Sequence, residues 1–205
     1  MEDAPAVPTR TERKKERTRK QLLEVALGLF FEKGIYWTKI EDITDRADVG
    51  KGTFYQYFET KEALLQELLE QGLDELLDRT HEAVAPAGPD AKAVISGIVR
   101  ARLEFFTEHP EYLLLFHQVR GLLQLKTETA KGLREVYEHH LDELAKILRP
   151  VLHGKDGGAR SLATAVAAFT SGLLTYYLLF DGPGDSKRRR QEIQDQIERS
   201  LQVAL

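Results

Sequence analysis

The chain has 205 residues, of which 42% are hydrophobic and 30% charged, and it contains no cysteine. A chain of this length buries a sizeable core as one domain or two small ones. Without cysteine, disulfide scaffolds, thiolate zinc sites and cysteine nucleophiles are excluded, and we expect a protein of the reducing cytoplasm. The first ten residues hold no apolar core, so no secretory signal is predicted.

The net charge of −4 is distributed unevenly along the chain. Residues 10–61 carry +3, residues 1–9 carry −2 and the remainder carries −5. A basic segment attached to an acidic body is typical of a nucleic-acid-binding domain joined to a second domain. Many helical proteins show such an imbalance by chance, so the motifs must decide.

The N-terminal part is predicted to be a flexible arm followed by a helix. Residues 1–9 hold two prolines and no apolar period, as is typical of a mobile arm. The helix begins at Arg10 and ends at Gly34. Its apolar stripe consists of Leu22, Ala26, Leu29 and Phe30. Its basic first half is either a solvated helix face or a phosphate-binding segment, and the sequence leaves both open.

Two short helices are predicted next. Thr38 and Glu41 form a capping-box pattern, which predicts that a helix starts at Thr38. The apolar period stops at Asp48, so this helix is short. After a tight turn, a helix from Lys51 to Phe58 has one apolar side and one side rich in hydrogen-bonding groups. Two such helices are what a helix-turn-helix needs to enter a major groove.

A family resemblance appears at this point. Residues 49–58 read VGKGTFYQYF and are followed by ETKEALL. The string closely resembles the DNA-binding signature of the TetR family of bacterial one-component transcription regulators, and the resemblance extends over roughly residues 12–70. Gly50 stands where the family often has Ser, which is a change of capping residue. The resemblance implies a regulator, most often a repressor, whose C-terminal domain binds a small-molecule effector.

Nine residues are predicted to contact a double-stranded DNA operator. By side-chain chemistry, Lys51 suits guanine, Gln56 suits adenine, and Thr53 suits either of these bases or a thymine methyl group. The resemblance implies that Lys51, Gly52 and Gln56 lie nearest the bases. It implies contacts with the DNA backbone for Thr38, Lys39, Thr53, Tyr55, Tyr57 and Lys61. The alternative for Tyr57 is a place in the core of the small domain.

Lys61 is predicted to bind a phosphate for a further reason. It lies in the first turn of the helix that Thr60 caps, where a positive charge is unfavourable for the helix dipole, so an external anion is the expected partner. That helix runs to about Ala85 and would link the two halves of the protein. Pro86, Gly88 and Pro89 interrupt the chain after it.

The rest of the chain is predicted to be helical as well. Five further helices are predicted, at 90–108, 111–125, 127–152, 159–181 and 186–204. We therefore expect an all-α protein of about nine helices. Its predicted domains are a flexible arm at 1–9, a helix-turn-helix domain at 10–62, and a ligand-binding and dimerisation domain at 63–205.

The last two helices are predicted to form a homodimer interface. Residues 161–180 contain no charged residue, which raises the alternative of a membrane span. Their small and hydroxyl-bearing residues instead favour a wholly buried helix, so no membrane partner is expected. In the final helix, Ile193, Ile197 and Leu201 form a narrow stripe that suits packing against a second copy of the chain. A dimer would also supply the two half-sites that tight DNA binding needs.

The resemblance implies that the effector site lies among the helices between about Leu64 and Phe180. His117 and Arg120 are three residues apart on an otherwise apolar helix and are therefore neighbours. Aromatic walls with few polar groups suit a small, largely apolar molecule. The predicted ligand residues are Phe105, Tyr112, Phe116, His117, Arg120, Tyr137, His140, Phe169 and Tyr176. Alternatively, the phenylalanines are plain core, and Arg120 only extends its charge to solvent.

Two other functions are weighed against this one. No catalytic motif supports a small helical enzyme, because the sequence lacks the G-x-S-x-G, H-E-x-x-H and P-loop patterns. His139 and His140 are adjacent and diverge by about 100° on a helix, so they do not share a metal easily. No catalytic residue, cofactor or metal is predicted. The third possibility is a DNA-binding dimer without a small-molecule switch.

Overall fold

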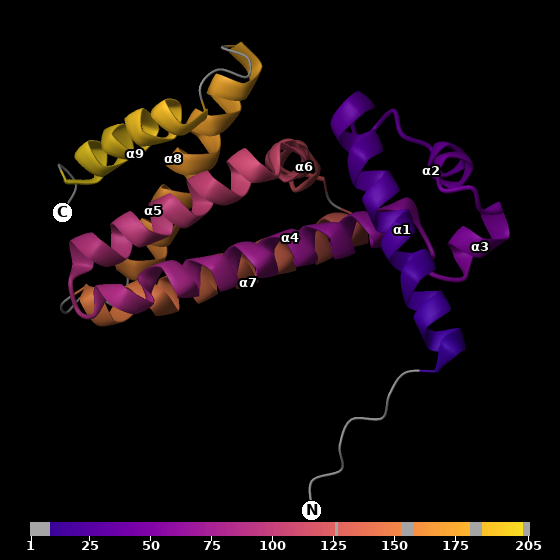
Figure 1. The fold of residues 1–205 in the computed structure, drawn as a ribbon, viewed down its shortest axis with the longest axis horizontal. Helices are drawn as coiled ribbons and strands as arrows, with labels where there is room; N and C mark the ends of the chain where they lie inside the picture. The colour runs from indigo at the N-terminus through magenta and orange to yellow at the C-terminus, as the bar shows by residue number, and fades with distance from the viewer. Residues whose placement is uncertain (1–8, 126, 153–157, 181–185, 203–205) are drawn as a thin grey trace, which may run out of the picture. The chain divides into compact units, whose positions relative to one another are not determined.

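The computed structural model describes residues 9–125, 127–152, 158–180 and 186–202, and within them it contains nine α-helices, two 3-10 helices and no strand (Figure 1). The α-helices are α1 (Arg10–Lys33), α2 (Ile40–Arg46), α3 (Lys51–Tyr55), α4 (Lys61–Val84), α5 (Ala91–Glu108), α6 (Pro110–Leu122), α7 (Glu128–Leu148), α8 (Gly158–Phe180) and α9 (Ser186–Gln202). The prediction of an all-α protein is confirmed. The chain forms two compact units, divided between Leu68 and Leu69. Most of the predicted arm, the loop at 153–157 and the turn at 182–184 lie outside the described residues.

Helix α1 begins and ends where its local signals predict. The Thr9 hydroxyl accepts a hydrogen bond from the Glu12 amide (3.3 Å), and the Glu12 carboxylate accepts one from the Thr9 amide (2.6 Å). This reciprocal pair gives acceptors to two backbone amides that have no hydrogen-bond partner within the helix. At the other end, Gly34 has a φ of 86°, in the left-handed region that favours glycine.

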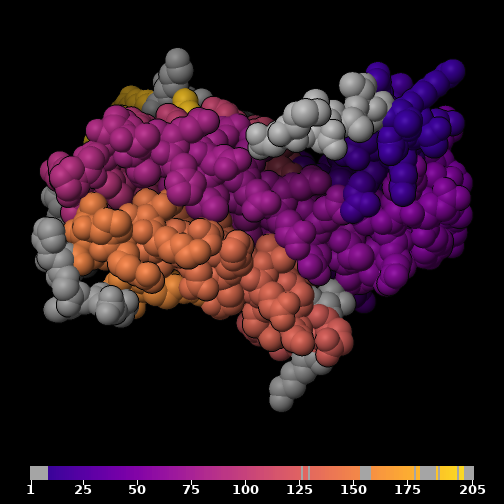
Figure 2. All heavy atoms as spheres, turned by 90° about the horizontal axis from the view of Figure 1, so that it is seen from below, coloured from indigo at the N-terminus to yellow at the C-terminus, as the bar shows by residue number. Residues whose placement is uncertain are grey.

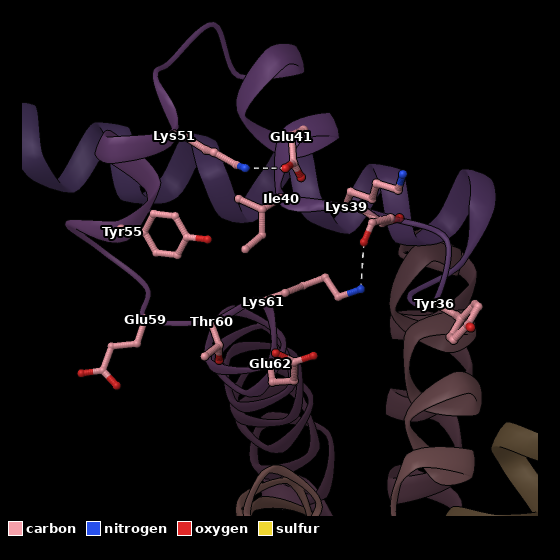
Figure 3. A pocket seen from close by; sticks show the side chains of 11 residues that line it. Tyr36, Lys39, Ile40, Glu41, Lys51, Tyr55, Glu59, Thr60, Lys61 and Glu62 are labelled. Atoms are coloured by element: carbon pink, nitrogen blue, oxygen red, sulfur yellow. Dashed lines mark hydrogen bonds and ion pairs between the residues drawn. The ribbon is translucent and has the colours of Figure 1, made fainter.

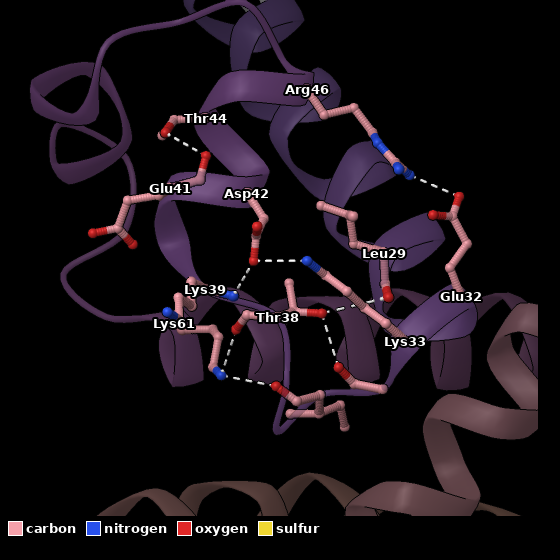
Figure 4. Close-up of polar contacts among 12 residues, drawn as sticks. Leu29, Glu32, Lys33, Thr38, Lys39, Glu41, Asp42, Thr44, Arg46 and Lys61 are labelled. Atoms are coloured by element: carbon pink, nitrogen blue, oxygen red, sulfur yellow. Dashed lines mark hydrogen bonds and ion pairs between the residues drawn. The ribbon is translucent and has the colours of Figure 1, made fainter.

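The predicted start of α2 at Thr38 is wrong, because Thr38 serves the preceding helix. Its side chain is fully buried, and its hydroxyl donates to the Gly34 carbonyl at 2.8 Å (Figure 4). The helix starts at Ile40 instead, and the Lys39 amide donates to the Asp42 carboxylate at 2.7 Å. A buried hydroxyl gains more by pairing with an otherwise unsatisfied carbonyl than by capping an exposed amide.

Helix α3 is shorter than predicted. It ends at Tyr55 rather than Phe58, and the following amides bond three residues back, as Tyr57 does to the Phe54 carbonyl (2.9 Å). Such tightening is common where a helix ends. The predicted inward pair is confirmed, because Phe54 is 0% and Phe58 3% exposed. The two rings lie 5.7 Å apart and anchor α3 in the core of the first unit.

The first unit is completed by the beginning of α4. Thr60 caps this helix as predicted, with its hydroxyl accepting from the Ala63 amide (3.0 Å). Arg19 of α1 forms an ion pair with Glu67 of α4, and its guanidinium lies 4.9 Å above the ring of Phe58. These contacts hold α1 and α4 together around the aromatic anchor of α3.

In the second unit, α5 packs against α6, α7, α8 and α9, and α7 packs along α8. Asp90 caps α5 and Thr127 caps α7, each with a side-chain oxygen that accepts from an amide of the first turn. Figure 2 shows side chains of α7 and α8 as an orange surface beside those of the C-terminal part of α4. The interior of this unit is lined by α5, whose residues are mostly buried.

Two predictions for the last helices are corrected. Helix α8 is not wholly buried, because Phe169 is 46%, Tyr176 56% and Phe180 71% exposed. Conversely, Ile193 and Ile197 of α9 are 1% and 0% exposed, so these two residues of the stripe pack inside their own chain, mainly against α5, rather than against a second copy. The side chain of Leu201 is not among those that the structure describes. Among the described helices, none combines the length and apolarity that a membrane crossing needs.

Candidate nucleic-acid interface

Helix α3 presents its polar side to solvent. Lys51, Gly52, Tyr55 and Gln56 are exposed, and Thr53 is half-buried. The opposite side of the helix is fixed by Phe54, which is fully buried. A short helix held by one aromatic anchor, with the groups that read base edges pointing outward, has the form required for insertion into a major groove.

A depression of about 480 Å³ lies beside α3 and gathers five of the nine predicted DNA residues. These five are Thr38, Lys39, Lys51, Tyr55 and Lys61. Figure 3 shows that α2, α3 and the start of α4 supply its walls. Gly52 and Thr53 of α3, and Gln56 directly after this helix, lie outside the depression. The depression also contains Glu41, Glu59 and Glu62, so its charge is mixed in the free protein.

Lys51 is held by an acid across the helix-turn-helix. Its ammonium group forms an ion pair with Glu41 of α2, and both side chains are about half exposed (Figure 3). The hydrogen bond to Glu41 raises the pKa of Lys51, and the same bond lowers the pKa of Glu41. Solvent screens such a pair, so it orients Lys51 without holding it strongly. DNA phosphates or bases would compete with Glu41 for this ammonium.

Two residues predicted to contact the DNA backbone make internal hydrogen bonds in the free protein. The Lys61 ammonium donates to the carbonyls of Ile35 and Thr38, each at 2.8 Å (Figure 4). These carbonyls take two of the three ammonium hydrogens and so give the lysine in the first turn of α4 a local role; its contact with a phosphate stays a prediction, and Lys61 lines the depression beside α3. The Thr38 hydroxyl is likewise occupied and fully buried, so it is closed to a phosphate. Both residues shape the turn between α1 and α2.

The two tyrosines of the signature differ in their surroundings. Tyr55 is 52% exposed and packs edge-on against Phe54, with 5.6 Å between ring centres. It lines the depression beside α3. Tyr57 is half-buried and lies in a second depression with Lys15 and Arg19 of α1. The basic start of α1 therefore comes near the signature, although acidic residues of α1 share that depression.

Sequence reasoning missed an aromatic pair between α1 and α2. Tyr36 is 83% and Trp37 71% exposed, and their rings meet edge to face at 5.0 Å. Tyr36 also lines the depression beside α3. Large aromatic residues in a short polar turn were the signal that could have indicated this part of the surface.

In the second unit, three predicted ligand residues meet in one polar cluster. Arg120 donates to the Tyr137 hydroxyl at 3.2 Å and to the Ser171 hydroxyl at 2.7 Å. His140 lies one turn beyond Tyr137 on α7 and bonds through Nε2 to Arg102, at 3.2 Å. Arg120 is thus not simply reaching for solvent.

The aromatic residues predicted to line the ligand site are divided between the interior and the surface. Phe105 and Phe116 are buried, and Tyr112 packs against both, with ring centres 5.7 and 6.0 Å away. Burial raises the pKa of Tyr112 to about 12. The prediction is corrected for the exposed members, because His117, Phe169 and Tyr176 do not reach this interior. His117 and Arg120 are neighbours in the helix, but His117 is exposed and Arg120 is half-buried.

The buried histidine should make stability sensitive to acid. Burial, followed by the charge of Arg102, lowers the pKa of His140 from 6.5 to about 3. As the pH falls, the His140 ring is protonated in the unfolded chain before it is protonated in the folded protein. The stability that goes with a neutral His140 is therefore intact above pH 6.5 and is lost as the pH falls towards 3. We expect the free energy of unfolding to decrease between pH 7 and 5, and less so in His140→Gln. His139→Gln, which alters an exposed neighbour, should keep the wild-type slope in urea titrations at each pH.

Comparison with known proteins finds a family model that matches part of the first unit. The family model "Bacterial regulatory proteins, tetR family" matches residues 22–68. The HTH-type transcriptional repressor KstR2 of Rhodococcus jostii is 36% identical over 90 residues, which are 44% of each chain. The match therefore spans less than half the length of this relative. The HTH-type transcriptional regulator TtgR of Pseudomonas putida is 26% identical over 83% of this chain and 84% of its own.

Solved structures share the fold over nearly the whole chain. The fatty acid degradation regulator FadR of Bacillus halodurans has a TM-score of 0.72 at 18% identity and covers 97% of both chains. FadR of Bacillus subtilis, solved in complex with stearoyl-CoA, also has a TM-score of 0.72 at 18% identity and covers 87% of this chain and 96% of its own. At such identity the likeness concerns the fold. The four proteins named are described as regulators or repressors.

Proposed function

From the premise that this chain belongs to the TetR family of bacterial regulators, we propose that it is a DNA-binding transcriptional repressor whose dimer leaves a palindromic operator when a small, largely apolar molecule binds. The observation that carries the proposal is the exposed polar side of α3, with Lys51, Thr53 and Gln56 above a buried Phe54. Those side chains suit base edges.

The dimer is proposed to form through α8. One α-helical module makes few contacts with DNA, and two modules must reach successive major grooves about 34 Å apart. The exposed aromatic face of α8, which includes Phe169, Tyr176 and Phe180, supports this choice. Monomeric proteins seldom leave a run of large apolar side chains in water.

Release by a ligand requires only a preference between two dimer geometries. Suppose that a molecule binds more tightly to a dimer whose DNA-reading helices are wrongly spaced than to the dimer that fits DNA. It then lowers DNA affinity by the difference between its binding free energies for the two dimers. The proposed site is the interior of the second unit, where Phe105, Tyr112 and Phe116 supply aromatic surface beside Arg120. The stearoyl-CoA complex of Bacillus subtilis FadR supports an apolar effector in this fold.

Replacement of Lys51 tests the proposed DNA contact. We expect Lys51→Ala to weaken binding to the operator in the chain's own promoter region by about 1–3 kcal/mol, roughly 5- to 150-fold, because a base contact is lost. The effect should depend on sequence and be small on random DNA of the same length. Electrophoretic mobility shifts across a salt series would measure it.

Lys146→Ala is the matched control, because Lys146 is also an exposed lysine in an ion pair, in this case with Glu143 of α7. It removes the same charge and should leave operator affinity unchanged. Equal loss in both variants would indicate a general charge effect, and no loss in Lys51→Ala would contradict the assignment of α3 as the base-reading helix.

A further inference from the structure

Arg102 of α5 is a buried charge that has no acidic partner in the part of the chain that the structure describes. Its side chain is 2% exposed, and its Nε donates to the Thr170 hydroxyl at 2.8 Å. Its second bond is to a neutral ring nitrogen of His140. Among the described residues, no carboxylate forms an ion pair with it. A buried guanidinium normally needs an anion to offset its lost hydration, so this arrangement is incomplete.

Arg120 repeats the arrangement from α6. Its two bonds also go to neutral hydroxyls, those of Tyr137 and Ser171. The acceptors of the two arginines are neighbours, because Thr170 is next to Ser171 on α8, and His140 lies one turn from Tyr137 on α7. Two guanidinium groups from different helices therefore converge on one segment of the α7–α8 pair. We name Arg102, Arg120 and their four acceptors the arginine cluster.

The electrostatics of the arginine cluster agree with its geometry. The pKa of Arg102 falls to about 10, mainly because of burial; Tyr137 acts against this shift, and the positive charge of Arg120 contributes to it. The two positive groups are thus close enough to repel each other. An acid from a second copy of the chain would not relieve Arg102, because the side chain is already enclosed within its own subunit. What reaches it must be small enough to be enclosed as well.

We propose that the effector carries a carboxylate, which the arginine cluster binds in place of its neutral acceptors. The planar fork of a guanidinium matches a carboxylate with two parallel hydrogen bonds, and such charge-assisted pairs are the stronger ones. Phe106 holds the Arg102 guanidinium 5.5 Å from its ring centre and so fixes its plane. The inference rests on the proposed function, since it assigns the chemical class of that effector, an apolar body with one acidic end.

The test compares acids with neutral molecules of the same shape. Dodecanoate and 1-dodecanol form one pair, and cholate and its methyl ester form another. The full-length protein is titrated with each compound, with binding followed by calorimetry and release from operator DNA by fluorescence anisotropy. We expect at least one acid to bind about 10-fold or more tightly than its neutral counterpart, as charge-assisted hydrogen bonds allow.

Arg102→Met separates a binding role from a structural one. Methionine removes the buried charge while filling similar space, so the Tm of the free protein should be unchanged or higher. The preference for the acid should disappear. Arg100→Met is the matched control, because Arg100 is exposed on the same helix and should leave both the Tm and the preference intact. Arg120→Gln, on the half-buried partner, supplies a second variant that should lose the preference if Arg102→Met folds poorly.

The outcomes distinguish this inference from the function on which it rests. If an alcohol or ester binds and releases DNA as well as its acid, the carboxylate is wrong while a ligand-released regulator stands. The inference is also overturned if no acid binds, or if both arginine variants keep the full preference. A wild-type protein that fails to bind its operator in the absence of any compound would instead contradict the proposed function itself.

Discussion

Replacing Phe54 by alanine should abolish specific DNA binding by unfolding the first unit. Phe54 is fully buried, and its ring meets both Tyr55 and Phe58. Truncating such a side chain costs about 3–5 kcal/mol, through lost burial and the cavity left behind. A unit of this size has little stability to spare, since small domains bury a smaller fraction of their surface.

The measurement combines urea unfolding with operator binding. The far-ultraviolet circular dichroism of Phe54→Ala should decrease only in part, because the second unit has a separate core around α5. Phe31→Ala is the matched control, since Phe31 lies in the same unit and is 40% exposed. It should cost much less and retain DNA binding. A Phe54→Ala protein that bound operator normally would show that α3 is not anchored by this ring.

The helix ends illustrate how much local sequence can predict. Thr60 caps α4 as predicted, and Thr9, Asp90 and Thr127 cap the helices that follow them in the same way. Each acts within three residues of itself, so no knowledge of the tertiary structure is needed. Thr38 carries the same signal and yet caps nothing, because the end of α1 brings carbonyls to it. A competing partner from an earlier helix is invisible to a local pattern.

In the candidate sites, too, local sequence predicts some features, whereas others depend on tertiary contacts. The exposed face of α3 followed from the spacing of Phe54 and Phe58, which point inward at helical intervals. Arg102 was missed because a charged residue on a mostly apolar helix is expected to lie at its solvent edge. Its burial depends on where Thr170 and His140 arrive, 68 and 38 residues later. The exposure of Phe169 also depends on tertiary packing. An uncharged helix sequence predicts burial, but it does not show which element covers each face of the helix.

A valine at Gly97 should strongly destabilise the second unit. Gly97 lies buried in α5, and a Cβ built there would stand 2.9 Å from the Ala83 carbonyl oxygen of α4 and 3.3 Å from a methyl group of Val84. The nearest atom belongs to the backbone, so the helix itself must move. Overpacking of this kind typically costs about 1–3 kcal/mol, and the branched valine should lie at the upper end.

Gly97→Ala should be milder, because alanine favours the helix by about 0.5–1 kcal/mol relative to glycine and so offsets part of the clash. Gly121 of α6 is the matched control, since a Cβ there meets nothing within 4 Å. Gly121→Ala should be neutral or stabilising. Thermal unfolding followed by circular dichroism would rank the three variants. If Gly97→Val unfolded at the wild-type temperature, the close approach of α5 to the end of α4 would not exist in solution.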